Sequence, residues 1–142
     1  MDIKQIKCTS LELSKQLKEA GYPQKYDDSL WWWCEIQDRQ GGEVSGIRLY
    51  NWETASNRKY NVPHLNTYVA PTVAELGEVL PEGLYSYKLK LDKNRWYVNY
   101  RKVNNDIYEA LNVSNESFIL FNTEADARAK MWLYLKKEGL IK

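Results

Sequence analysis

The sequence predicts an α+β domain: an antiparallel sheet built from hairpins, with three helices packed mainly on one side. Three segments combine a threonine cap with apolar residues at helical spacing. Two other segments alternate apolar and polar residues around a short turn, as hairpin strands do. Runs of this kind favour antiparallel strands covered by helices. The length, 142 residues, suits a single domain over residues 1–142.

The three predicted helices share a start signal, a threonine followed three residues later by a carboxylate. In a capping box the hydroxyl accepts from a first-turn amide, and the acid accepts from the amide of the cap residue. The predicted caps are Thr9, Thr72 and Thr123. The corresponding stop signals are Gly21, Pro81 and Gly139. Gly77, inside the second helix, is attributed to close packing.

A first hairpin is predicted from LWWWCEI, residues 30–36, and the pair Gly41-Gly42, which suits a type I′ turn. Counting outward from this turn places Glu35 opposite Arg48 and Trp33 opposite Tyr50. Alternation then gives an aliphatic side, which is expected to pack on the helices, and an aromatic side. The aromatic side is the candidate partner-binding surface, because large exposed apolar patches and aromatic anchors are typical of interfaces. Its residues are Trp31, Trp33, Tyr50 and Trp52.

Residues 53–70 have no sustained period and are expected to form a long connection with one short strand. Connections of this length in compact domains are often functional. Their apolar residues favour a lid over the aromatic side, and the alternatives are cover by a helix or a second subunit, or an open platform.

A second hairpin is predicted from LYSYKLKLDKNRWYVNYRK, residues 84–102, with Lys93-Asn94 as the turn. One side is apolar and pairs Tyr87 with Tyr100. The other side carries Lys88, Lys90, Arg95, Tyr97 and Arg101. Cations for phosphates and a ring for stacking suit single-stranded nucleic acid, which makes this side the alternative binding surface. We favour a simple solvated face, because such residues also discourage sheet edges from pairing and the formal net charge is only +1.

Two further short strands are expected at DIYEALNV, residues 106–113, and SFILF, residues 117–121. The first of these segments also has a helical alternative. The third predicted helix, after Thr123, follows them.

The stretches APTVAELGEVLP, residues 70–81, and TEADARAKMWLYLKKEGLI, residues 123–141, resemble small uncharacterised proteins of prophages and mobile elements, notably of Bacteroides-type bacteria. Those proteins commonly open with a short helix like TSLELSKQLKEAGYPQ, followed by an aromatic strand. The resemblance implies a bacterial or phage context. The family has no agreed activity, so it assigns no functional residue.

Residues suited to catalysis or metal binding are scarce. His64 is the one histidine, and no partner stands at a ligand spacing. Cys34 is expected opposite Leu49, where apolar neighbours disfavour a thiolate, and it does not form a CxxC pair with Cys8. We therefore expect a non-enzymatic protein without cofactor or metal.

The chain is rich in aromatic residues, at 13%, and contains no run of about 18 apolar residues. Its first residues, MDIKQIKC, do not read as a signal peptide. We expect a cytoplasmic protein that engages a protein partner or itself, with nucleic acid as the alternative partner and no membrane.

Overall fold

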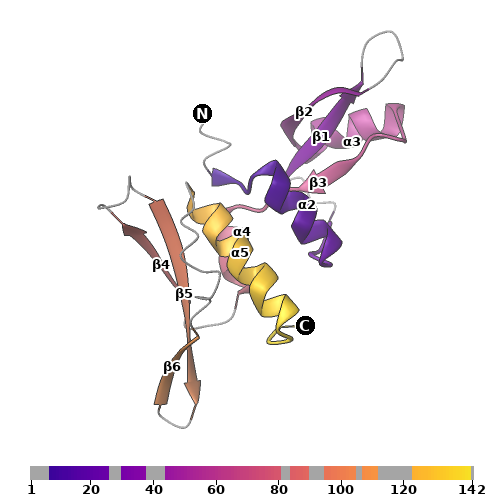
Figure 1. Ribbon diagram of the computed structural model, residues 1–142. Helices are drawn as coiled ribbons and strands as arrows, with labels where there is room; N and C mark the ends of the chain where they lie inside the picture. Colours follow the sequence, from indigo (N-terminus) through magenta and orange to yellow (C-terminus); the bar gives the residue numbers. More distant parts are fainter. Residues whose placement is uncertain are drawn as a thin grey trace. The chain divides into compact units, whose positions relative to one another are not determined.

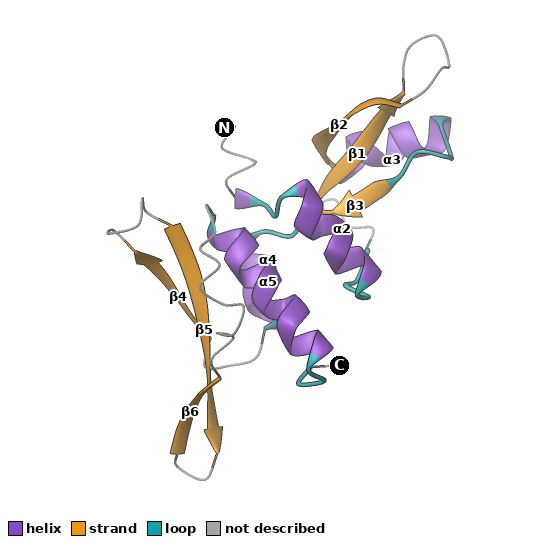
Figure 2. Cartoon of the chain, viewed as in Figure 1, coloured by secondary structure: helices purple, strands orange, loops and turns teal. Residues whose placement is uncertain are grey.

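The computed structural model describes residues 7–25, 30–37, 44–80, 84–89, 95–104, 107–111 and 123–141. Side chains are described for residues 7–25, 30–37, 44–80 and 123–141. The chain divides into two compact units, Met1–Pro71 and Thr72–Lys142, and each is described by itself. The α+β class is confirmed: these residues contain four helices, one more than predicted, and two three-stranded antiparallel sheets (Figures 1 and 2). The single domain stays a prediction.

The first unit contains the first sheet, whose strand order is β2-β1-β3. Strand β1 is Trp31–Gln37, β2 is Val44–Asn51 and β3 is Thr67–Val69. Both pairings are antiparallel. Helix α2, Leu11–Glu19, precedes the sheet, and α3, Trp52–Asn61, follows β2 directly.

Helix α2 begins one residue later than predicted. Its cap is Ser10, whose side chain accepts from the Leu13 amide. The predicted cap, Thr9, is buried instead, with its Oγ1 2.7 Å from Oγ of Ser14. The predicted stop at Gly21 is confirmed, because Gly21 has a φ of 92°, a left-handed conformation that costs glycine little.

Helix α3 was not predicted; residues 53–61 had been expected in a connection. Its cap is Asn51, whose side chain accepts from the Thr54 amide at 3.0 Å. Only Ala55 of the helix is fully buried, so there is no apolar stripe to give a helical period. The local signals are a cap residue, an acid in the first turn and bases in the last turn. The predicted short strand in this region is confirmed as β3.

The predicted register of the first hairpin is wrong by one residue. Trp33 pairs with Leu49 rather than Tyr50, and Glu35 pairs with Ile47 rather than Arg48. The pairing also contains an irregularity between Ile36 and Gln37. A one-residue slip exchanges the two faces of a strand, because side chains alternate with a period of two. The predicted turn residues, Gly41 and Gly42, lie outside the described residues.

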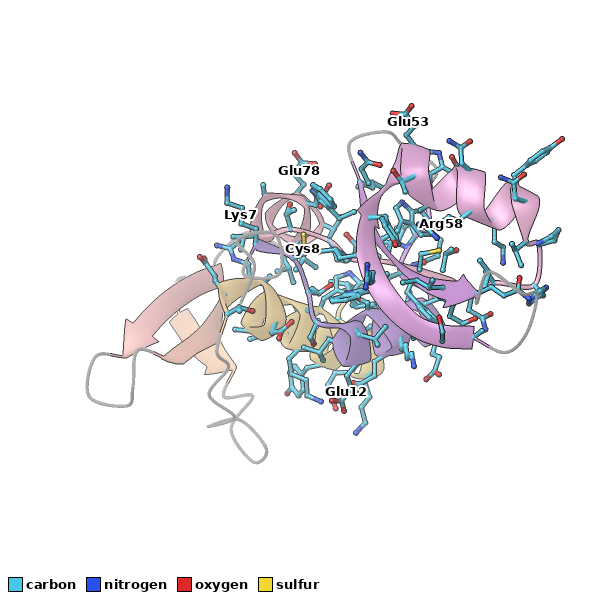
Figure 3. All side chains as sticks on the ribbon, turned by 90° about the horizontal axis from the view of Figure 1, so that it is seen from above. Lys7, Cys8, Glu12, Glu53, Arg58 and Glu78 are labelled. Carbon is cyan, nitrogen blue, oxygen red and sulfur yellow. The ribbon has the colours of Figure 1, made fainter. Side chains whose placement is uncertain are left out.

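The two helices of the first unit cover opposite sides of the first sheet (Figure 3). Helix α3 covers the side of Trp32, whose ring centroid lies 4.8 Å from that of Trp52. Helix α2 covers the side of Trp33, since Lys18 of α2 lies over the ring of Tyr68, which pairs with Trp33. This unit therefore departs from the predicted arrangement of helices on one side.

The second unit contains helices α4, Val73–Val79, and α5, Glu124–Lys137. The strands of its sheet are β4, Leu84–Leu89, β5, Arg95–Asn104, and β6, Ile107–Leu111, in that order. Helix α5 packs on β4 and β5, and α4 packs against α5. The predicted strand at residues 106–113 is confirmed as β6, whereas residues 117–121 lie outside the described residues.

The predicted caps of this unit are confirmed. Thr72 and Glu75 form a complete capping box at α4, and the Thr123 side chain accepts from the Asp126 amide at α5. Gly139, with a φ of 70°, ends α5 as predicted. Close packing at Gly77 is also confirmed, because a Cβ there would lie 3.0 Å from Nη1 of Arg128.

The predicted register of the second hairpin is wrong by three residues. Tyr87 pairs with Tyr97, and Tyr100 pairs with Leu84. An odd shift changes which positions share a side of the sheet. The predicted turn, Lys93-Asn94, lies outside the described residues.

Candidate functional site

The four aromatic residues predicted as one partner-binding surface do not share a side of the first sheet. Trp31 and Trp33 alternate on the α2 side, whereas Tyr50 pairs with Trp32 on the α3 side. Trp52 lies outside the strands, as the first residue of α3. All four are half-buried. The aromatic residues are therefore divided between two helix–sheet contacts, and a flat platform does not form.

The contacts on the two sides differ in kind. On the α2 side, Nε1 of Trp33 donates to the carbonyl of Thr9 at 2.9 Å. On the α3 side, Trp32 is 1% exposed against Trp52, and the Arg58 guanidinium lies 4.6 Å from the ring centroid of Tyr50. Figure 3 shows Arg58 between α3 and the sheet, while Glu53 points away from it. Three adjacent tryptophans are thus accommodated because both sides of β1 are covered.

The edges of the first sheet are its distinctive feature, and the direction of the backbone groups follows from the ladder. The amide of Glu35 donates to Asn66, and the amide of Ala70 donates to Trp31, so odd-numbered residues of β1 face β3. Neighbouring residues of a strand face opposite directions, so even-numbered residues of β1 face β2. It follows that Thr67 in β3, and Ile47 and Leu49 in β2, direct their backbone groups away from β1.

The outer edge of β3 is closed by side chains. Nζ of Lys18 donates to the carbonyl of Thr67 at 2.9 Å, and Oε1 of Gln24 accepts from the amide of Val69 at 2.9 Å. Just before the strand, Nζ of Lys59 donates to the carbonyl of Leu65. One outward backbone group of each of these residues therefore has a side-chain partner, and an incoming strand would have to displace these side chains.

The outer edge of β2 has no such cover among the described residues. No described strand pairs with it, and no described side chain bonds the outward backbone groups of Ile47 or Leu49. The first three residues of β2 are exposed, and Val44 is 43% exposed. A row of unpaired donors and acceptors is a ready template for another strand.

The titratable groups beside the first sheet include the Cys34 thiol and the Glu35 carboxylate. Burial raises the pKa of the Cys34 thiol; Arg58 and Lys59 oppose the shift, and Glu35 adds to it. The Glu35 carboxylate accepts from the Asn66 amide and its Nδ2, at 3.0 and 3.1 Å, which fixes the start of β3. His64 is exposed.

The described residues contain no group of three His, Cys, Asp or Glu side chains placed to hold a metal ion. Within the same residues, every helix is too short or too polar to cross a membrane.

The residues of the predicted basic surface are divided by the register of the second sheet. Lys88 pairs with Trp96, whereas Arg95 and Tyr97 pair with residues of the other alternation, Leu89 and Tyr87. Arg101 pairs with Ala110 of β6. Lys90 lies outside the described residues. Nucleic-acid binding by these residues stays a prediction.

Comparison with known proteins gives no matching family model, no matching curated protein and no matching solved structure. The function must therefore be argued from the residues of this chain.

Sequence reasoning missed the side-chain bonds at the β3 edge, because two of the residues that make them, Lys18 and Gln24, are far from β3 in the sequence. Lys18 and Thr67 are 49 positions apart, and Gln24 and Val69 are 45 apart. No local pattern predicts such contacts. The signal in the sequence was the β-branched and aromatic run Thr67-Tyr68-Val69, which favours a strand but does not say what bonds its edges.

Proposed function

We propose that this chain is a non-enzymatic binding protein, which engages a protein partner or a second copy of itself through the β2 edge of the first sheet. The observation that carries the proposal is the difference between the two edges: side chains close β3, and no described residue closes β2. Strand addition supplies main-chain hydrogen bonds, and neighbouring side chains supply specificity. The cytoplasmic and phage or mobile-element setting belongs to the same proposal.

The aromatic residues have a changed role in this proposal. Trp31 and Tyr50 lie at the end of the β1–β2 ladder, on opposite sides of the sheet, and both keep part of their surface exposed. A strand added to the β2 edge would place its alternate side chains beside Tyr50, whereas Trp31 lies one strand further in, on β1. Half-buried aromatic residues next to an open edge suit an interface, since aromatic anchors dominate binding energy.

A second copy is an occupant with a plausible register. Two β2 strands related by a two-fold axis can pair antiparallel with Ile47 opposite Ile47 of the second copy. Arg48 then stands opposite Gly46 of the other copy, so like charges are not directly opposed. Val44 stands opposite Tyr50, which covers part of the exposed valine side chain.

The test is Ile47→Pro, which removes the outward amide and leaves the ladder to β1 intact. Proline is tolerated in edge strands at positions of this kind. Ile47→Thr is the matched control, because it shortens the side chain but keeps the amide. We expect wild type and Ile47→Thr to self-associate in sedimentation velocity, and Ile47→Pro to sediment as a monomer. Circular dichroism should show that Ile47→Pro remains folded.

If the wild-type protein is monomeric, the partner is another protein, and its capture by immobilised wild type should again be lost with Ile47→Pro. The proposal is overturned if the wild type neither self-associates nor captures a protein in an Ile47-amide-dependent way.

A further inference from the structure

Three lysines gather around β3, away from the open edge. Lys15 and Lys18 lie one turn apart on α2, with Nζ atoms 5.6 and 5.0 Å from the centroid of the Tyr68 ring. Lys59 comes from the last turn of α3, on the other side of the sheet. The two helices therefore bring ammonium groups to one short strand from both sides.

Hydrogen bonds fix the positions of two of these ammonium groups. Nζ of Lys18 donates to the carbonyl of Thr67, and Nζ of Lys59 donates to the carbonyl of Leu65. Carbonyls two residues apart on one edge of an extended chain are about 7 Å apart. Two lysine ammonium groups are thus held as neighbours by the same stretch of backbone.

Among the described residues, no ion pair balances the charge of these three lysines. No described carboxylate forms an ion pair with Lys15, Lys18 or Lys59; the ion pair in the described residues joins Glu124 and Arg128 of the second unit. Glu35, which lies nearby, is occupied by Asn66. Glu19, the other acid close to Tyr68, also raises the pKa of the phenol, although burial and Glu35 contribute more to this shift.

The electrostatics agree with close approach of the two ammonium groups. Burial, and then the positive charge of Lys59, lowers the pKa of Lys18. An anion between the two groups would relieve this repulsion. Each ammonium has three donors and gives one to a carbonyl, so two remain on each for a ligand.

We propose that Lys18 and Lys59 form a binding site for a phosphate group at the outer edge of β3, with Lys15 adding positive charge beside it. A phosphate has several acceptor oxygens and more than one negative charge, so it can accept from both ammonium groups at once. The site is distinct from the open β2 edge and does not depend on strand addition there.

The experiment is a titration of the ¹⁵N-labelled full chain with inorganic phosphate, at ionic strength held constant with chloride. We expect amide shifts to concentrate at residues 65–68 and near Lys18 and Lys59. Lys18→Gln and Lys59→Gln keep a donor for the backbone carbonyl but remove the charge. Each should weaken phosphate binding about fivefold, the effect of losing one unit charge about 4 Å away in water.

The matched control is Lys137→Gln, an exposed lysine in the second unit, which should leave the phosphate titration unchanged. Shifts spread over many lysines, or shifts that persist in both Lys18→Gln and Lys59→Gln, would overturn the site. A ten-residue oligothymidylate provides a second arm. Binding that needs the same two lysines assigns the phosphate to a nucleic-acid strand, whereas phosphate binding without it assigns a small phosphate compound.

Discussion

The two edges of the first sheet differ in how their backbone groups are satisfied. At β3, Lys18 donates to the outward carbonyl of Thr67 and Gln24 accepts from the outward amide of Val69. At β2, the outward groups of Ile47 and Leu49 have no partner among the described residues. Closing one edge of a sheet and leaving the other bare directs any strand addition to a single place. The comparison indicates where another strand could add to this sheet, which is at the β2 edge and not on an aromatic face.

The largest expected effect tests the direction assigned to the backbone groups of β2. Arg48→Pro removes an inward amide of the β1–β2 ladder, so it should lower the free energy of unfolding by on the order of 3 kcal/mol. Ile47→Pro removes an outward amide and should cost less than half as much. Urea unfolding of both variants measures the difference. Equal losses would show that the two amides do not face opposite directions.

A smaller effect is expected from opening the closed edge. Gln24→Ala leaves the amide of buried Val69 without its acceptor, which costs about 1 to 3 kcal/mol in urea unfolding. Gln24→Glu keeps an acceptor at this place and should cost less. The alanine variant should also self-associate more strongly than wild type in sedimentation, because a second edge becomes available; unchanged self-association would mean that Lys18 and Lys59 suffice to block β3.

The smallest expected effect is on the pH dependence of stability, which should change with a substitution in β3 but not with one in β2. Burial raises the pKa of Tyr68, a residue of β3, above its ordinary value of 10.0. A raised pKa contributes stability that is present below pH 10.0 and is lost as pH rises through the folded-state value. Tyr68→Phe should therefore flatten the alkaline loss of stability measured by urea unfolding.

Two other groups bear on that measurement. The raised pKa of Cys34 also makes stability fall as pH rises above 9.0. Both Tyr68→Phe and Ile47→Thr retain Cys34 and therefore this loss. The lowered pKa of Lys18 acts in the opposite sense, since stability then rises with pH up to 10.5. Ile47→Thr, at β2, should leave the pH profile unchanged; an equal change in both variants would remove the distinction.

Helix ends were predictable because the forces that set them act within one turn. The capping box of Thr72 and Glu75 and the stop at Gly139 were recognised from spacing, and both are confirmed. Thr9 was one residue off because a second hydroxyl, on Ser10, stands next to it. The buried bond from Thr9 to Ser14 decided between the two.

Strand registers were not predictable from the turns. A two-residue turn at Gly41-Gly42 predicts a register that differs by one residue from the observed one. In the observed register Trp32 lies on the side where it packs against Trp52. Residues 52–61 gave no period, because their helix is stabilised mainly by a cap at Asn51 and by contact with the sheet.

The sequence by itself determined the α+β class, the strands of both hairpins and the helix ends at Gly21, Thr72, Thr123 and Gly139, because these depend on alternation, spacing and local hydrogen bonds. Only the tertiary structure decided which side each tryptophan faces, that both sides of the first sheet are covered, and that side chains bond the β3 edge while no described residue bonds the outward groups of Ile47 and Leu49 in β2. The physical reason is distance along the chain. Register and edge closure depend on contacts between residues tens of positions apart, and a one-residue slip reverses every face.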